Sequence, residues 1–523
     1  MTFTSKKDNL LDKFVGTSRY GGILLHPTSL PGEYGIGDLG PEVYKFIDFL
    51  NKYKQNLWQI LPLGPTGYGN SPYQCFSAFA GNPLIISPEK LCEIGLLTNK
   101  EWILQDRFPE SSVDYERVIP YKWQLLEFAF KNYKQKQPWK LDREFSNFMN
   151  KHSFWLDDYS LFMSIKKAHH LRAWNEWDED LRFRDTNALE RWKKDYENEI
   201  EFQKFTQFIF FKQWNEVKSY ANLKDILIIG DIPIFVAYDS VDVWAHPEFY
   251  YLNDKRDLLY VAGVPPDYFS STGQRWGNPL YNWNLLKKQG YRWWIQRIKH
   301  NLDQVDILRI DHFRGFESYW QIEVSEATAE VGEWILGPGI DLFLKMKEEL
   351  GSLPIIAEDL GIITPEVEDL LQQTGFPGMR VLQFAFGDKD QASIKNKYLP
   401  HYYLPNTIAY TGTHDNSTTK AWFEKLTSKI KKQVLDYINS DGKDVVGDLI
   451  RLAWSSVASM AIIPLQDLLR LGDEARMNLP GTLKNNWEWR FTLDQVTRER
   501  GRQIKNLSRL YDRILPVKLK DKS

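Results

Sequence analysis

The sequence predicts a (β/α)8 barrel of the α/β class, carrying large insertions. Eight short apolar runs bounded by turn residues recur along the chain, at 22–27, 57–64, 225–236, 305–311, 354–361, 379–386, 406–415 and 458–467. Amphipathic helical patterns lie between most of them, as at 43–53, 291–302, 339–350 and 421–438. Continuous apolar strands alternating with helices indicate a parallel sheet covered on both faces. Eight such units, with no GxGxxG after the first, favour a closed barrel over an open doubly wound sheet.

The spacing of the strands is uneven, which indicates two insertions into a single catalytic domain spanning 1–523. Residues 84–224, between the second and third strands, have mostly helical patterns and many aromatic residues, so we expect an inserted helical subdomain there. Residues 237–285 follow the third strand. Their stretch 263–279 is rich in Gly and Pro and lacks a period, which predicts an ordered loop. Long loops on one face of a barrel typically build a substrate cleft.

Composition excludes several classes of protein. Lys plus Arg is 66 and Asp plus Glu is 69, so there is no basic excess to follow a nucleic-acid backbone. The two cysteines provide no disulfide framework and no metal-ligand cluster. Neither a signal peptide nor a long uncharged apolar stretch occurs. We therefore expect a soluble, cytoplasmic protein.

Aromatic residues are abundant in polar, turn-rich stretches such as 175–192 and 273–284. Outside periodic apolar runs, an aromatic face is a candidate to stack on the C–H face of a sugar ring. The alternative is that a long chain anchors its insertions with small aromatic cores.

The predicted strands end in charged residues that should converge, because barrel enzymes carry their sites at the C-terminal ends of the strands. These are Asp231 on the third strand, Arg309, Asp311 and His312 on the fourth, Glu358 and Asp359 on the fifth, and His414 and Asp415 on the seventh. A single Asp at a strand end is often a helix cap or an ion-pair partner. Several carboxylates gathered together raise one another's pKa, which is what paired acid and nucleophile chemistry requires.

A metal site is the less favoured interpretation of this cluster. Adjacent residues on a strand point to opposite faces, so one member of each Asp-His pair should face away. No HExxH or cysteine-rich spacing occurs, and neither GxSxG nor a phosphate-binding loop is present. We expect no metal and no cofactor.

Two carboxylates in different environments are the working groups of glycoside cleavage. Glu358 follows an apolar run that should desolvate it and raise its pKa, which suits a general acid/base. Asp311 lies near Arg309 and Arg314, whose charge should hold it ionised as a nucleophile. Asp415 would then bind sugar hydroxyls more tightly in the transition state.

The motifs resemble those of the amylomaltases, the 4-α-glucanotransferases or disproportionating enzymes of glycoside hydrolase family 77, which are related to the α-amylases. The resemblance extends from about residue 18 past 490 and rests on 23–40, 67–83, 230–250, 263–283, 308–320, 355–367, 376–386 and 410–416. It implies retaining, double-displacement transfer of α-1,4-glucan segments to the 4-hydroxyl of an acceptor, through a covalent glucosyl-aspartate. The implied substrates are malto-oligosaccharides, glucose and glucans of the starch or glycogen type.

Carried onto this chain, the resemblance gives Asp311 as nucleophile, Glu358 as general acid/base and Asp415 as transition-state stabiliser, in agreement with the chemical argument. It places six further residues on the sugar sites, namely Tyr73, Asp231, Trp276, Arg309, His312 and His414. The motif at 67–83 departs from the family at two positions: Asn70 stands where the family has Asp, and Cys75 where it has Ser, and both replacements are nearly isosteric. Within 237–285, the loop carrying Tyr268 and Phe269 resembles the lid over the acceptor side.

Several alternatives stay open on the sequence. Tyr73 and Trp276 could be loop anchors, and Asp231 could orient a neighbour instead of binding sugar. Strand alternation would turn His312 away from Asp311 unless the strand has already ended there. A hydrolase shares the covalent intermediate and differs only in its acceptor, whereas a non-catalytic glucan-binding barrel would lack one of the three carboxylates.

Overall fold

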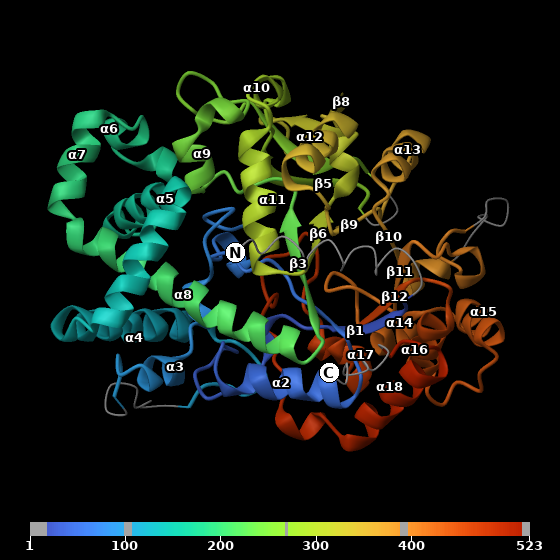
Figure 1. Ribbon diagram of the computed structural model, residues 1–523. Helices are drawn as coiled ribbons and strands as arrows, with labels where there is room; N and C mark the ends of the chain where they lie inside the picture. The colour runs from blue at the N-terminus through green and yellow to red at the C-terminus, as the bar shows by residue number, and fades with distance from the viewer. Residues whose placement is uncertain (1–17, 99–106, 267–269, 388–395, 515–523) are drawn as a thin grey trace, which may run out of the picture.

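A closed barrel of eight parallel strands forms the centre of the computed structural model, which describes residues 18–98, 107–266, 270–387 and 396–514 (Figure 1). Around the barrel the strand order is β1-β12-β11-β10-β9-β6-β3-β2. The strands are β1 (Tyr20–Leu24), β2 (Leu57–Gln59), β3 (Leu227–Pro233), β6 (Ile307–Asp311), β9 (Ile355–Ala357), β10 (Gly378–Val381), β11 (Thr407–Tyr410) and β12 (Met460–Pro464). Each falls within, or overlaps, one of the eight predicted runs. The predicted (β/α)8 fold class is confirmed.

The register of β3 against β6 brings charged residues together. Asp231 pairs with Arg309, and Pro233 with Asp311, so the polar ends of both strands lie at the same edge of the barrel. Below them the strands are almost continuously buried, as expected for a parallel sheet that is covered on its outer face and packed within.

Helices cover the outside of the barrel. They include α2 (Pro41–Lys52), α11 (Arg292–Gln304), α12 (Ile340–Leu350), α13 (Pro365–Thr374), α14 (Thr419–Lys425), α15 (Ser428–Ile438), α16 (Val445–Ser455), α17 (Leu465–Leu469) and α18 (Arg498–Leu510). The pattern at 421–438 predicted one helix, whereas the chain forms α14 and α15. Thr427 is extended and its side chain accepts a hydrogen bond from the Ile430 N–H, so a new helix starts where the pattern seemed continuous.

The residues between β2 and β3 are mainly helical and form the left side of Figure 1. They comprise α3 (Pro88–Glu93), α4 (Tyr115–Lys136), α5 (Trp139–Ala168), α6 (Glu179–Arg182), α7 (Thr186–Asp195) and α8 (Glu197–Leu223). Their aromatic residues mostly pack against one another. Trp177, within the polar stretch 175–192, and Trp174, just before it, are both buried. In this region the packing interpretation of the aromatics is correct.

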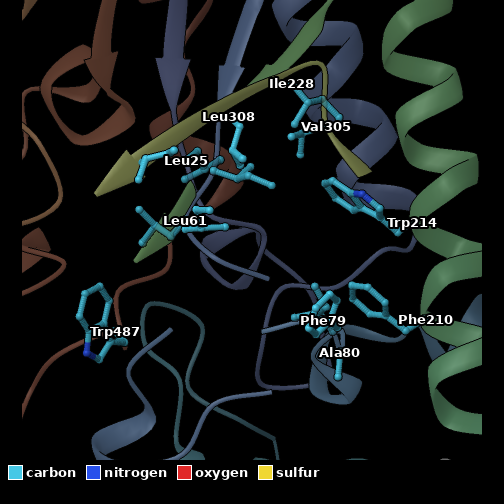
Figure 2. Packing of buried hydrophobic residues seen from close by; sticks show 14 of the residues in the cluster. Leu25, Leu61, Phe79, Ala80, Phe210, Trp214, Ile228, Val305, Leu308 and Trp487 are labelled. Carbon is cyan, nitrogen blue, oxygen red and sulfur yellow. The ribbon is translucent and has the colours of Figure 1, made fainter. Parts of the chain in front are cut away.

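Helix α8 attaches this helical region to the barrel. Figure 2 shows Phe210 beside Phe79, and Trp214 close to Val305 and Ile228. The Trp214 indole N–H also donates to the Gln304 carbonyl oxygen at 2.9 Å. Burial of large aromatic side chains of this kind contributes about 1.5–3 kcal/mol each.

Within the described ranges, no helix has both the length and the apolar character required to cross a membrane.

A second, four-stranded antiparallel sheet stands beside the C-terminal ends of β3 and β6. Its order is β5-β4-β7-β8, from β4 (Tyr260–Val264), β5 (Gln274–Pro279), β7 (Ser318–Glu323) and β8 (Glu333–Leu336). The prediction of a loop over 263–279 was therefore wrong for β5 and the end of β4. A bulge interrupts their pairing, and Gly263 approaches the Gln274 carbonyl so closely that a Cβ would lie 2.3 Å from it. Such short, glycine-interrupted strands show no alternation in the sequence.

Candidate active site

A largely buried chain of hydrogen bonds and ion pairs links four of the predicted site residues. Arg309 donates from Nη1 to Asp231 Oδ2 at 2.6 Å and from Nη2 to Asp311 Oδ1 at 2.8 Å. The Tyr73 hydroxyl donates to the same Asp231 oxygen at 2.8 Å. Arg309 lies on β6 between the two carboxylates, so one guanidinium fixes the side chains at the ends of two neighbouring strands.

The electrostatics of this chain separate its two carboxylates. The Asp231 side chain is fully buried, and burial raises its pKa, although Arg309 opposes that rise. Asp311 keeps 31% of its side chain exposed. The pKa of Arg309 is raised well above its ordinary value, against its own desolvation, by Asp231 and Asp311. A permanently charged guanidinium therefore holds Asp311 by one oxygen and leaves its other oxygen at the accessible end of the strand.

Glu358 follows β9 and is held by two backbone N–H groups. Its Oε2 accepts from His312 N and its Oε1 from Leu360 N, both at 2.7 Å. Burial, together with the nearby charge of Asp311, raises the pKa of Glu358 to about 8. The expected rise by desolvation is thus found, and it comes despite hydrogen bonds that favour the ionised form.

His312 lies just beyond the end of β6. Its backbone is left-handed, with φ 54° and ψ 50°, so strand alternation no longer applies to it. Its ring stands edge-on to Trp276, with centroids 4.8 Å apart. Burial lowers the pKa of His312 to about 3, which makes its imidazole neutral, and its Nε2 has no hydrogen-bond partner. A buried polar atom without a partner is available to a ligand hydroxyl.

Asp415 sits in the turn after β11, where its side chain is 43% exposed. The Asn478 amide donates to Asp415 Oδ1 at 2.6 Å, and Arg476 donates to the Asp415 carbonyl oxygen at 2.7 Å. His414 Nε2 lies 3.3 Å from Asp415 Oδ2. The argument that adjacent His and Asp must face opposite ways is therefore wrong for this pair, because β11 has ended at Tyr410.

Three aromatic rings pack together beside these carboxylates. The rings of Tyr73 and His414 are nearly parallel, with centroids 5.2 Å apart and an angle of 13° between their planes. Trp487 lies 5.9 Å from Tyr73 and 6.0 Å from His414. Tyr73 is thus fixed by packing as well as by its hydrogen bond to Asp231. It anchors its loop and also borders the site.

Two charged residues of the predicted cluster have other roles. Arg314 was expected to hold Asp311 ionised, but it donates to the Ile362 carbonyl oxygen at 2.6 Å and to Ser318 Oγ at 3.3 Å. The left-handed turn at His312 redirects the chain before Arg314 is reached. Asp359 is buried and accepts from Met379 N at 2.6 Å and from Arg380 at 2.8 Å, so it is a structural partner of β10. Tyr268 and Phe269 lie outside the described residues.

Asn478, Trp487 and Asp467 were missed by the sequence reasoning. Asp467 accepts from Thr411 Oγ1 at 2.5 Å and from Thr419 Oγ1 at 2.6 Å, and so holds both ends of the turn that carries Asp415. Asn478 and Trp487 belong to an irregular segment after the last strand, which has no periodicity to place it. Asp467, at the end of the eighth apolar run, carried a signal, and Trp487 lies in the stretch 485–491, which also fits the family resemblance. In the described part of the chain, no three His, Cys, Asp or Glu side chains are grouped to hold a metal ion.

A parallel barrel with a raised-pKa glutamate beside an arginine-bound aspartate belongs to the class of barrel enzymes that act on carbohydrates. Residues 25–495 match the 4-alpha-glucanotransferase family, glycoside hydrolase family 77. The chain belongs to this family and is a glycosyltransferase.

Individual relatives cover nearly the whole chain. A 4-alpha-glucanotransferase of Synechocystis is 49% identical over 508 residues, which are 96% of this chain and 99% of the relative. One of Thermus thermophilus is 46% identical and covers 94% of this chain and 99% of its own length. Among solved structures, the amylomaltase of Streptococcus agalactiae in complex with acarbose is 41% identical, with a TM-score of 0.92, covering 95% of this chain and 100% of that one.

Proposed function

We propose that this protein transfers α-1,4-glucan segments from a donor glucan to the 4-hydroxyl of an acceptor glucose or glucan, by double displacement with retention. The names of its relatives and the acarbose bound to the Streptococcus agalactiae structure support this substrate class. Donors and acceptors are malto-oligosaccharides, glucose and glucans of the starch or glycogen type. We further propose that it works in the cytoplasm, in the metabolism of maltose, starch or glycogen.

Asp311 is the nucleophile and Glu358 the general acid/base. In the first step the Asp311 carboxylate bonds to the anomeric carbon, while the Glu358 proton passes to the departing glycosidic oxygen. In the second step ionised Glu358 takes the proton of the acceptor 4-hydroxyl, whose oxygen bonds to the anomeric carbon and releases Asp311. These roles rest on the different environments of the two carboxyl groups. Burial and the charge of Asp311 raise the pKa of Glu358 to about 8, whereas one oxygen of Asp311 lies 2.8 Å from the Arg309 guanidinium.

Asp415 stabilises the transition state, and the surrounding polar groups bind the sugar. One oxygen of Asp231 and Nδ1 of His414 are buried without hydrogen-bond partners, as is Nε2 of His312. Hydrogen bonds to sugar hydroxyls would satisfy all three atoms. Asp231 would then be both the ion-pair partner of Arg309 and a sugar-binding residue. The substrate-binding set is completed by Tyr73, Arg309 and Trp276. The Trp276 ring packs against His312.

We propose transfer rather than hydrolysis. Both reactions pass through the same glycosyl-enzyme, and transfer requires that a sugar hydroxyl reacts with it before water does. Tyr268 and Phe269 lie in the sequence between β4 and β5, in the stretch that resembles the family's lid over the acceptor side. Cover over the acceptor side would exclude water from the reactive intermediate.

The test is incubation with maltotriose. Transfer gives a ladder of shorter and longer glucans with little increase in reducing ends. An increase in reducing ends that matches substrate loss would mean hydrolysis instead. Asp311→Asn and Glu358→Gln should each abolish the ladder, whereas Glu366→Gln, at an exposed carboxylate at the start of α13, should leave it unchanged. Near-normal transfer by either of the first two variants would overturn the assigned roles.

A further inference from the structure

A pair of tryptophans stands on the antiparallel sheet next to the candidate active site. Trp320 of β7 and Trp334 of β8 are directly paired across the strands, and their rings meet edge to face with centroids 5.2 Å apart. The Trp320 indole N–H donates to the Ala329 carbonyl oxygen at 3.0 Å, which fixes that ring. Trp334 is 39% exposed, so the pair is a rigid support with one open ring.

Arg314 lies against Trp334 from beneath. Its guanidinium carbon is 3.7 Å from the centre of the Trp334 ring, and the residue is only 4% exposed. Because the guanidinium is buried and the ring is not, the covered face of Trp334 is the inner one and its outer face meets solvent. The stacked cation and the edge contact with Trp320 together hold the indole in one orientation.

The same arginine connects this ring to the loops around Glu358. Arg314 is two residues beyond His312, whose N–H donates to Glu358, and it donates to the carbonyl oxygen of Ile362 at 2.6 Å. Ile362 is four residues beyond Glu358, a separation that an extended chain spans in roughly 14 Å at most. The side chain of Ile362 is 49% exposed and adds an apolar edge to the same region.

We propose that the outer face of Trp334 is a binding subsite for a glucose unit of an oligosaccharide acceptor, some units beyond the bond that is made or broken. This inference rests on the proposed function. Glu358 protonates the departing oxygen, so the sugar chain beyond that oxygen passes along the loops next to Glu358, toward Trp334. The C–H face of a glucose unit stacks on a flat, immobilised indole. Glucose as acceptor occupies only the position at Glu358 and does not reach Trp334.

The experiment compares two acceptors, reducing-end-labelled glucose and reducing-end-labelled maltohexaose, with maltotriose as donor. For Trp334→Ala, the ratio of kcat/KM for maltohexaose to kcat/KM for glucose should fall about three- to tenfold, through a higher KM for maltohexaose. Trp334→Leu, which keeps apolar cover over Arg314 without a flat ring, should show the same fall. Trp334→Phe should recover most of the ratio.

Trp139→Ala is the matched control, because Trp139 is 73% exposed on α5, in the helical region away from this sheet. It should leave the ratio unchanged. An unchanged ratio in Trp334→Leu, or equal losses with both acceptors, would overturn the subsite. Failure of the wild-type protein to extend either acceptor would instead overturn the proposed function. This outcome is seen in the wild type alone, so it is distinct from any effect of the Trp334 variants.

Discussion

Replacing Glu358 by Gln should change how the stability of the protein depends on pH. Burial raises the pKa of Glu358 from 4.5 to about 8, so the folded protein retains a proton that the unfolded chain releases near pH 4.5. The stabilisation from this proton is fully present below pH 4.5 and is lost as the pH rises to about 8. Gln does not titrate, so the variant lacks this loss.

The size of the effect follows from the two pKa values. The difference between 4.5 and about 8 corresponds to at most about 5 kcal/mol of unfolding free energy. For a chain of 523 residues the unfolding entropy is about 1.1 kcal/mol/K, so the effect on Tm is about 4 °C. Gln also loses one of the two hydrogen bonds that Glu358 accepts, but that cost does not depend on pH.

Differential scanning calorimetry of the wild type and Glu358→Gln between pH 5 and pH 9 gives the comparison. The Tm of the variant minus that of the wild type should increase by about 4 °C over this interval. In Glu366→Gln, an exposed carboxylate with a lowered pKa, the corresponding difference should stay constant. A constant difference in Glu358→Gln as well would refute the raised pKa and with it the general-acid argument.

Three further predictions concern activity, each measured as maltotriose disproportionation. First, kcat/KM should fall as the pH rises past about 8, because Glu358 must be protonated to donate; a flat profile through pH 9 would contradict this. Second, Asp415→Asn should lower kcat by about 100-fold or more with a modest change in KM, because its interaction is strongest in the transition state. An unchanged kcat would exclude that role. Third, Asn478→Ala should lower kcat about tenfold, because it frees the Asp415 oxygen that Asn478 holds at 2.6 Å. A change confined to Tm would show that Asn478 acts on stability alone.

The barrel could be predicted because its strands form short, mainly apolar runs bounded by turn residues. Parallel strands that are buried on both faces require such runs, so all eight were found. The antiparallel sheet could not be predicted in the same way. Strands β4 and β5 are interrupted by a bulge and by Gly263, and β7 and β8 come from a different part of the chain, so no single stretch contains the pattern.

The carboxylates of the candidate site could be predicted because the C-terminal ends of the strands of a barrel converge, independently of the conformation of the loops. The environment of each could be predicted only where sequence neighbours remain spatial neighbours. Arg309 stays beside Asp311 on β6, whereas the left-handed residue His312 carries Arg314 away to Ile362 and Trp334. Asn478 reaches Asp415 from an irregular segment more than sixty positions along the chain, and no local pattern reports such a contact.

The most direct test of the proposed mechanism is to trap the glycosyl-enzyme. Glu358→Gln should still react with α-maltosyl fluoride, whose leaving group needs no proton, but should be slow to transfer the sugar onward. Mass spectrometry of its peptides should then find a maltosyl group on Asp311, and none in the Asp311→Asn, Glu358→Gln double variant. A sugar attached to another residue, or no attached sugar while fluoride is released, would contradict Asp311 as the nucleophile.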